Sequence, residues 1–191
     1  MGRMTLDMLR ASRDILFSDS PPDMPSVYES EESIDALRDA VDEYLDRIDA
    51  GLLDADDDRR LHVFHHVVGD IERIGDHGVN IAQRADRVRR GGHPFSRQAA
   101  DELNHMFDRS AELCRLAFAA LQSEDRAAAH EALEVEKDVD RLEDQYQANH
   151  IHRLETETCD PEAGILFVEI LHNLERIGDH AVNVAGDVLL I

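Results

Sequence analysis

The sequence ERIGDH occurs twice in this chain, at residues 72–77 and again at residues 175–180. The similarity extends on both sides, since DIERIGDHGVNIA at 70–82 aligns with NLERIGDHAVNVA at 173–185. Six identical residues in a chain of 191 indicate an internal repeat. Both copies have helical hydrophobic periodicity, so the sequence predicts two equivalent helices, each with an acid near either end of the repeated segment.

Helical periodicity runs through almost the whole chain, and no segment shows the alternation of a β-strand. The expected helices are 4–17, 27–50, 55–90, 97–122, one from the turn at 122–125 to about 157, and one from Pro161 to near the C-terminus. RGGHP at 90–94 is the clearest break. The prediction is an all-α fold: one domain over 1–191, built of two tandem antiparallel three-helix bundles with a shortened first helix. Repeat one spans 1–91 and repeat two spans 95–191.

Apolar residues at helical spacing predict which faces are buried. The second helix is expected to pack through Ile34, Leu37, Val41, Leu45 and Ile48, and the third through Leu61, Phe64, Val68, Ile71, Gly75, Gly78 and Ala82. A glycine inside a helix costs about 1 kcal/mol relative to alanine. Its repetition as Gly75 and Gly178 therefore predicts close approach of a neighbouring helix at both positions.

The chain carries 42 acidic and 20 basic residues, a formal net charge of -22. This charge repels nucleic acid and anionic membrane surfaces, and it suits cations or a basic partner surface. A salt-adapted surface would also explain most of it. No apolar stretch is long enough to span a bilayer, and Cys114 and Cys159 form no motif. We expect a cytoplasmic protein without membrane insertion.

Each half of the chain also carries a second acidic pair on its middle helix. EESID at 31–35 precedes the first ERIGDH by 41 residues, and EKDVD at 136–140 precedes the second by 39. Residues four apart share a helix face, and the antiparallel turns bring both pairs of a repeat to the same height. Crowded carboxylates favour a multivalent cation, so we predict one metal site in each repeat. The predicted ligands are Glu31, Asp35, Glu72 and Asp76 in repeat one, and Glu136, Asp140, Glu175 and Asp179 in repeat two. A solvated acidic face is the alternative.

At these residues the sequence resembles the PhoU family of phosphate-transport accessory proteins. The two ERIGDH segments resemble the family signature, and EESID and EKDVD resemble its acidic motif on the middle helix. The resemblance implies two three-helix repeats and carboxylate clusters that bind iron, with zinc, manganese, nickel or magnesium as alternatives. It also implies a non-enzymatic regulator that restrains phosphate uptake, with phosphate ABC transporter subunits, a sensor kinase and a second copy of the chain as partners.

Two other metal sites fit shorter patterns. Glu102 with His105, and Glu169 with His172, both match Glu-x-x-His, which would suit a ferritin-like di-iron carboxylate protein. The other pattern is a helically spaced zinc set of His62, His66 and Asp70. For His77 and His180 we expect structural hydrogen bonding, because each points about 100° away from the adjacent aspartate.

Overall fold

The computed structural model describes residues 1–92 and 94–191, and His93, in the predicted break, lies outside the described residues. Within these ranges the chain forms six α-helices and one short 3-10 helix, with no strand. The helices are α1 Gly2–Phe17, α2 Met24–Asp46, η1 Ala50–Leu52, α3 Ala55–Gly91, α4 Arg97–Ser123, α5 Arg126–Glu155 and α6 Pro161–Val188. The all-α prediction is confirmed. The repeat boundaries at 1–91 and 95–191 stay a prediction.

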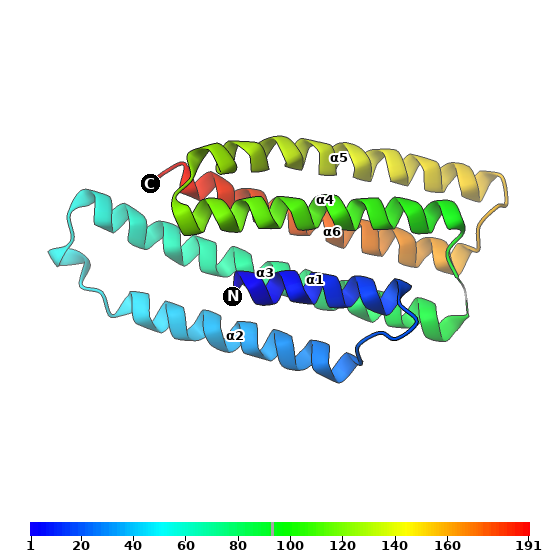
Figure 1. The fold of residues 1–191 in the computed structure, drawn as a ribbon, viewed down its shortest axis with the longest axis horizontal. Helices are drawn as coiled ribbons and strands as arrows, with labels where there is room; N and C mark the ends of the chain where they lie inside the picture. Colours follow the sequence, from blue (N-terminus) through cyan, green and yellow to red (C-terminus); the bar gives the residue numbers. More distant parts are fainter. Residues whose placement is uncertain (93) are drawn as a thin grey trace.

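The long helices α3 and α6, which carry the repeated segments, pack against each other at the centre of the molecule. In Figure 1, α2 lies along one edge and α5 along the opposite edge. Helix α1 packs on α3, and α4 packs on α6, so each repeat buries its own middle and last helices against its first. The two repeats together form one elongated bundle (Figure 1).

Local capping sets most helix starts. The side chains of Asp54, Ser96, Asp125 and Asp160 each accept hydrogen bonds from backbone N–H groups in the first turn of the helix that follows. These caps explain why the predicted starts of α3, α4, α5 and α6 agree with the structure within a residue.

The bounds of α2 differ from the predicted 27–50. The helix begins at Met24 because Asp23 accepts a hydrogen bond from Ser26 N, and because Pro25 fits the first turn. It ends at Asp46 instead of continuing to Gly51. The chain then forms η1, where the side chain of Asp49 accepts from Gly51 N.

Two residues predicted to be core are exposed in repeat one. Leu37 and Phe64 are 40% and 38% exposed, whereas their counterparts Leu142 and Phe167 in repeat two are 3% and 1% exposed. The reason is the length of the first helix: α1 has 16 residues and α4 has 27, so α4 covers more of its repeat. The predicted shortening of the first helix is therefore confirmed, and the burial of these two side chains is wrong.

None of the helices within residues 1–92 and 94–191 is both long enough and apolar enough to cross a membrane.

Candidate metal centre

Three of the four acids predicted for repeat one converge. Glu31 and Asp35 lie one turn apart on α2, and Asp76 faces them from α3, with one ligand oxygen from each within 4.8 Å of the others. Oδ1 of Asp35 is buried and has no hydrogen-bond partner. Burial first, and then the charge of Asp35, raises the pKa of both Glu31 and Asp76. An orphaned carboxylate oxygen beside two further carboxylates fits the donor set of a hard cation.

The fourth predicted acid, Glu72, lies outside this set of three. It sits one turn before Asp76 on α3 and interacts electrostatically with Asp76 and Asp35. Burial, followed by the charge of Asp76, raises the pKa of Glu72, while the nearby guanidinium of Arg38 acts in the opposite direction. Glu72 therefore lies beside the trio, and the guanidinium of Arg38 supplies a positive charge next to it.

Repeat two contains the equivalent trio. Ligand oxygens of Glu136 and Asp140 on α5 and of Asp179 on α6 all lie within 4.8 Å of one another. Burial raises the pKa of Glu136, and the charges of Asp140 and Asp179 raise it further. Arg176 donates to Asp179 Oδ2 at 3.0 Å, so this trio is partly neutralised from its own helix.

The remaining predicted ligand, Glu175, lies in a different cluster. Its carboxylate converges with Glu143 of α5 and His172 of α6, again with ligand atoms within 4.8 Å. Burial raises the pKa of Glu175 to about 7, with additions from Asp179 and Glu143. Sequence reasoning missed Glu143, and it placed His172 only in the Glu-x-x-His pattern with Glu169. They lie one turn beyond Asp140 and one turn before Glu175, so extending both acidic faces by one turn would have found them.

The repeated glycines lie where a neighbouring helix approaches closely. A Cβ added at Gly75 would lie 3.2 Å from Ile34 Cδ1 on α2, and one added at Gly178 would lie 3.2 Å from Val139 Cγ1 on α5. The predicted close approach is confirmed at both positions. Because each glycine directly precedes an aspartate of a trio, it lets the last helix bring that acid against the middle helix.

The repeated histidines form a pair across the two repeats. His77 donates through Nδ1 to Asn173 Oδ1 at 2.9 Å, and His180 donates through Nδ1 to Asp70 Oδ1 at 2.7 Å. The two rings stack with centroids 5.5 Å apart. Burial lowers the pKa of His77, because it disfavours the charged form of the ring. The expected structural hydrogen bonding is confirmed.

The residues of the two Glu-x-x-His patterns are not assembled into one site. Glu102 pairs with buried Arg153 at 2.8 Å, and His105 bonds Tyr146 at 2.6 Å. Glu169 pairs instead with Arg84 of α3 at 3.2 Å. The structure therefore gives no support to a ferritin-like di-iron core.

The suggested zinc set is also dispersed. His62 is directed to its own helix, with Nδ1 2.8 Å from Asp58 O, while Asp70 accepts from His180. His66 interacts electrostatically with Asp187 of α6. These interactions direct the three side chains to different partners, so the structure does not support the set.

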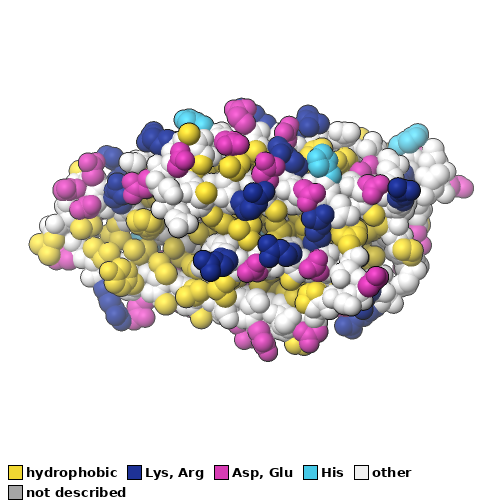
Figure 2. Space-filling model, in the orientation of Figure 1, with side chains coloured by type: hydrophobic (Ala, Val, Ile, Leu, Met, Phe, Trp, Pro, Cys, Tyr) yellow, Lys and Arg dark blue, Asp and Glu magenta, His cyan; other side chains and the backbone are white. Residues whose placement is uncertain are grey.

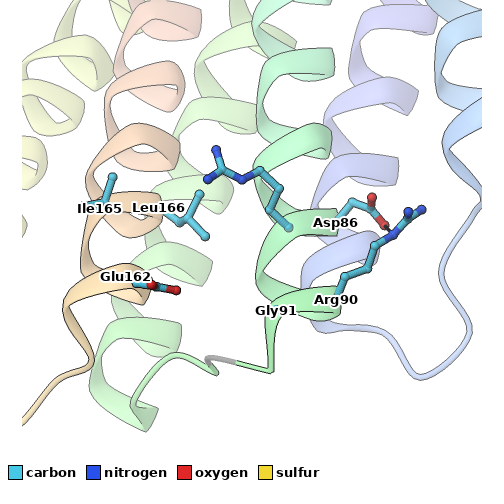
Figure 3. Close-up of a pocket in the computed structure, with 7 residues that line it drawn as sticks. Asp86, Arg90, Gly91, Glu162, Ile165 and Leu166 are labelled. Atoms are coloured by element: carbon cyan, nitrogen blue, oxygen red, sulfur yellow. Dashed lines mark hydrogen bonds and ion pairs between the residues drawn. The ribbon is translucent and has the colours of Figure 1, made fainter.

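A surface hollow of about 650 Å³ opens between the last turns of α3 and the first turns of α6. Figure 3 shows Ile165 and Leu166 on α6. On α3, Asp86 and Arg90 form an ion pair at 2.9 Å on the side of the helix that faces away from α6. None of the predicted metal ligands lines this hollow. On the face seen in Figure 2, basic and acidic side chains alternate, with no continuous basic area of the kind that binds nucleic acid.

Comparison with known proteins agrees with this architecture. The family model "PhoU domain" matches residues 1–85 and 103–188. A relative from Xylella fastidiosa (strain 9a5c), named phosphate-specific transport system accessory protein PhoU homolog, is 29% identical over all of this chain and 80% of its own length. A relative of the same name from Pseudomonas aeruginosa is 30% identical over 86% of this chain and 68% of its own length.

Two solved structures share the fold. The crystal structure of PhoU from Pseudomonas aeruginosa superimposes with a TM-score of 0.89 at 24% identity, covering 98% of this chain and 90% of that one. A phosphate transport system regulatory protein PhoU from Streptococcus pneumoniae gives a TM-score of 0.82 at 16% identity, covering 98% of this chain and 87% of that one. With both repeats matched by the family model and the helical architecture shared, this chain belongs to the PhoU family.

Proposed function

We propose that this protein is a non-enzymatic regulator of phosphate uptake, a metal-binding adaptor that acts in the cytoplasm on a phosphate ABC transporter and its sensor kinase. The observation that carries the proposal is the pair of carboxylate trios at equivalent positions of the two repeats. The relatives named as phosphate-transport accessory proteins support the biological role. An adaptor acts through its binding surfaces and its bound ions, so this role needs no catalytic nucleophile.

The donor set favours hard or borderline divalent cations. Each trio offers only carboxylate oxygens, which suit magnesium, manganese and ferrous iron, while softer metals prefer thiolate or imidazole ligands. Iron is the metal that the family resemblance implies, with zinc, manganese, nickel and magnesium as alternatives. When bound, the cation would neutralise acids that otherwise repel one another, and it would tie α2 to α3 and α5 to α6.

Elemental analysis tests the metal-binding part. Wild-type protein incubated with ferrous iron, manganese or zinc and then desalted should retain metal. The double variant Asp76→Asn, Asp179→Asn should retain much less, because each trio loses one of its three carboxylate charges. Asp144→Asn, at an exposed position on α5, is the matched control. Equal metal content in the double variant and the wild type would refute the assignment of the trios.

Capture of transporter subunits tests the adaptor part. Metal-loaded wild-type protein should retain the transporter's cytoplasmic ATPase subunit on an affinity resin, and the double variant should retain it weakly. Light scattering on the same samples measures whether the chain forms the homodimer that the resemblance implies. Failure of the loaded protein to bind any transporter subunit would contradict the adaptor role, even if metal binding is measured.

A further inference from the structure

Near the turn that joins them, α2 and α3 carry an apolar face that the other described helices leave exposed. Leu37, Tyr44 and Phe64 are 40%, 68% and 38% exposed on it. Apolar side chains gather at this end of the molecule in Figure 2, where Figure 1 places the end of α2 and the start of α3. We propose that this face docks a helix of a partner protein, one with an apolar stripe and basic side chains beside it.

Repeat two shows what lies on the equivalent face there. The middle helices align with an offset of 136 − 31 = 105, and the last helices with an offset of 175 − 72 = 103. The α2 positions Leu37, Val41, Tyr44 and Ile48 therefore correspond to Leu142, Tyr146, Asn149 and Arg153 of α5. The first half of α4 lies on these α5 residues. Its Glu102 accepts from Asn149 and from Arg153, both at 2.8 Å, and its His105 bonds Tyr146 at 2.6 Å.

Helix α1 has no counterpart of this half of α4. The buried positions of the two helices align with the same offset of 105, pairing Thr5, Met8, Leu9, Ser12 and Ile15 with Ser110, Leu113, Cys114, Ala117 and Ala120. Because α1 begins at Gly2, the described part of repeat one contains no equivalent of residues 97–106 of α4. Ten helical residues span about 15 Å, so the uncovered face fits a helix of nearly three turns.

The exposed face of repeat one is more apolar than its covered counterpart. The positions at which α5 makes polar contacts with α4, namely Tyr146, Asn149 and Arg153, carry Val41, Tyr44 and Ile48 in repeat one. An exposed apolar patch of this kind is typical of a surface that binds another protein. A docking helix would need apolar side chains where α4 has Glu102 and His105, because a carboxylate buried there would have no hydrogen-bond donor.

The charge at this end of the molecule determines which helix fits. Residues 39–58 contain nine acids and one arginine. Asp39, Glu43 and Asp46 are 72%, 68% and 77% exposed, so their charges act on an approaching partner. They favour a basic helix, whereas a second copy docked through the same face would bring like charges together. Apolar anchors one turn apart, flanked by basic residues, are a recurring pattern of helix recognition.

The inference deepens the proposed function and rests on it in one respect, since the occupant is taken to be a protein on which the adaptor acts. A designed peptide tests the chemistry of that occupant. It has the sequence of residues 97–110, with Glu102→Leu and His105→Leu to match the apolar face, and with Asp101→Lys and Asp108→Lys at exposed positions of α4. A second peptide carries the two leucines and keeps both aspartates.

Fluorescence anisotropy with the full-length protein measures the binding of both peptides. At low salt the basic peptide should bind at least tenfold more tightly than the acidic one, and the ratio should fall in about 0.5 M salt, where charges are screened. Equal binding of the two peptides at low salt, or no binding of the basic one, would overturn the proposal.

Variants of the protein test where the peptide binds. Leu37→Gln and Tyr44→Ser should each weaken binding of the basic peptide at least fivefold. Both side chains are exposed, so these substitutions leave the core intact. Ile151→Ser is the matched control, because Ile151 is an apolar side chain on α5 that is 56% exposed, and it should change binding less than twofold. Unchanged binding in both face variants, or an equal loss in the control, would mean that the peptide binds elsewhere and would overturn the proposal.

Two further outcomes are distinguishable. A wild-type dimer that Leu37→Gln and Tyr44→Ser convert to monomers, measured by light scattering, would make a second copy the occupant and overturn the proposal. Transporter capture separates the docking face from the proposed function. Wild-type protein that binds the basic peptide through this face but captures no transporter subunit would leave the face standing and remove the adaptor role. Capture that is undiminished in a protein carrying both face substitutions would keep the adaptor role and remove the face.

Discussion

Glu175 is the residue whose ionisation should matter most for the stability of the metal-free protein. Burial, with help from Asp179 and Glu143, raises its pKa from 4.5 to about 7. Because the folded-state pKa lies above the unfolded one, the fold disfavours the ionised carboxylate. Its contribution to stability is therefore lost as pH rises from about 4.5 to about 7. Replacing the carboxylate by a neutral amide, as in Glu175→Gln, should recover that loss at higher pH.

The size of the effect follows from the pKa difference. A shift of 7 − 4.5 = 2.5 corresponds to roughly 3 kcal/mol when the group is fully ionised in both states. The Glu175 side chain is 16% exposed, so water and salt screen part of its repulsion with the neighbouring carboxylates. We therefore expect Glu175→Gln to stabilise the metal-free protein by about 1 to 2 kcal/mol at pH 8.5. For a chain of this size that is a rise in Tm of about 2 to 8 °C.

Thermal unfolding followed by circular dichroism, in the presence of a chelator and between pH 8.5 and pH 4.5, measures this difference. The gain should shrink steadily toward pH 4.5, where the wild-type carboxyl group also becomes protonated. Glu131→Gln, at an exposed position on α5, controls for the general removal of one negative charge from a chain of net charge -22. A gain of equal size at both ends of the pH range, or an equal gain in the control, would refute the reasoning.

Urea denaturation tests two further contacts. Gly178→Val should destabilise the protein by about 1 to 3 kcal/mol, because the first added carbon already lies 3.2 Å from Val139 Cγ1. Gly186→Ala should instead stabilise the protein by up to about 1 kcal/mol, because a Cβ added there meets nothing within 4 Å. Glu102→Ala should cost about 3 to 5 kcal/mol, since it leaves the guanidinium of Arg153, 5% exposed, buried without its carboxylate. A loss below about 1 kcal/mol in either destabilising variant would contradict the corresponding contact.

The helices could be predicted because their signals are local. Asp160 and Pro161 mark the start of α6 in the sequence, and the structure has the aspartate side chain accepting from the first-turn N–H groups. The predicted start of α2 at residue 27 was wrong because a local signal was ambiguous. Asp23 caps the helix, but it lies in a proline-rich stretch whose sequence predicts a break. Local signals do not report how much of one helix is covered by its neighbours. The exposure of Leu37 and Phe64 depends on how far α1 extends over them, which periodicity along α2 and α3 does not contain.

The site was predictable as far as helix geometry allows. Equal heights on antiparallel helices brought Glu31 and Asp35 against Asp76, as the spacing predicts. The fourth acid of each repeat lies one turn earlier on the last helix, and its neighbours there differ between the two repeats. Glu72 has Arg38 beside it, while Glu175 has Glu143 and His172. The repeated motif contains no information on these neighbours, because they differ between the repeats.

The Asp-His step inside the repeated segment explains why the chain carries this segment twice. Consecutive helical residues point about 100° apart, so Asp76 can face α2 of its own repeat while His77 faces α6 of the other. The structure has both contacts: Asp76 converges with Glu31 and Asp35, and His77 bonds Asn173. The second copy does the same in reverse, with His180 bonding α3. One dipeptide thus builds a trio inside each repeat and a stacked histidine pair between them, and neither copy alone could form that pair.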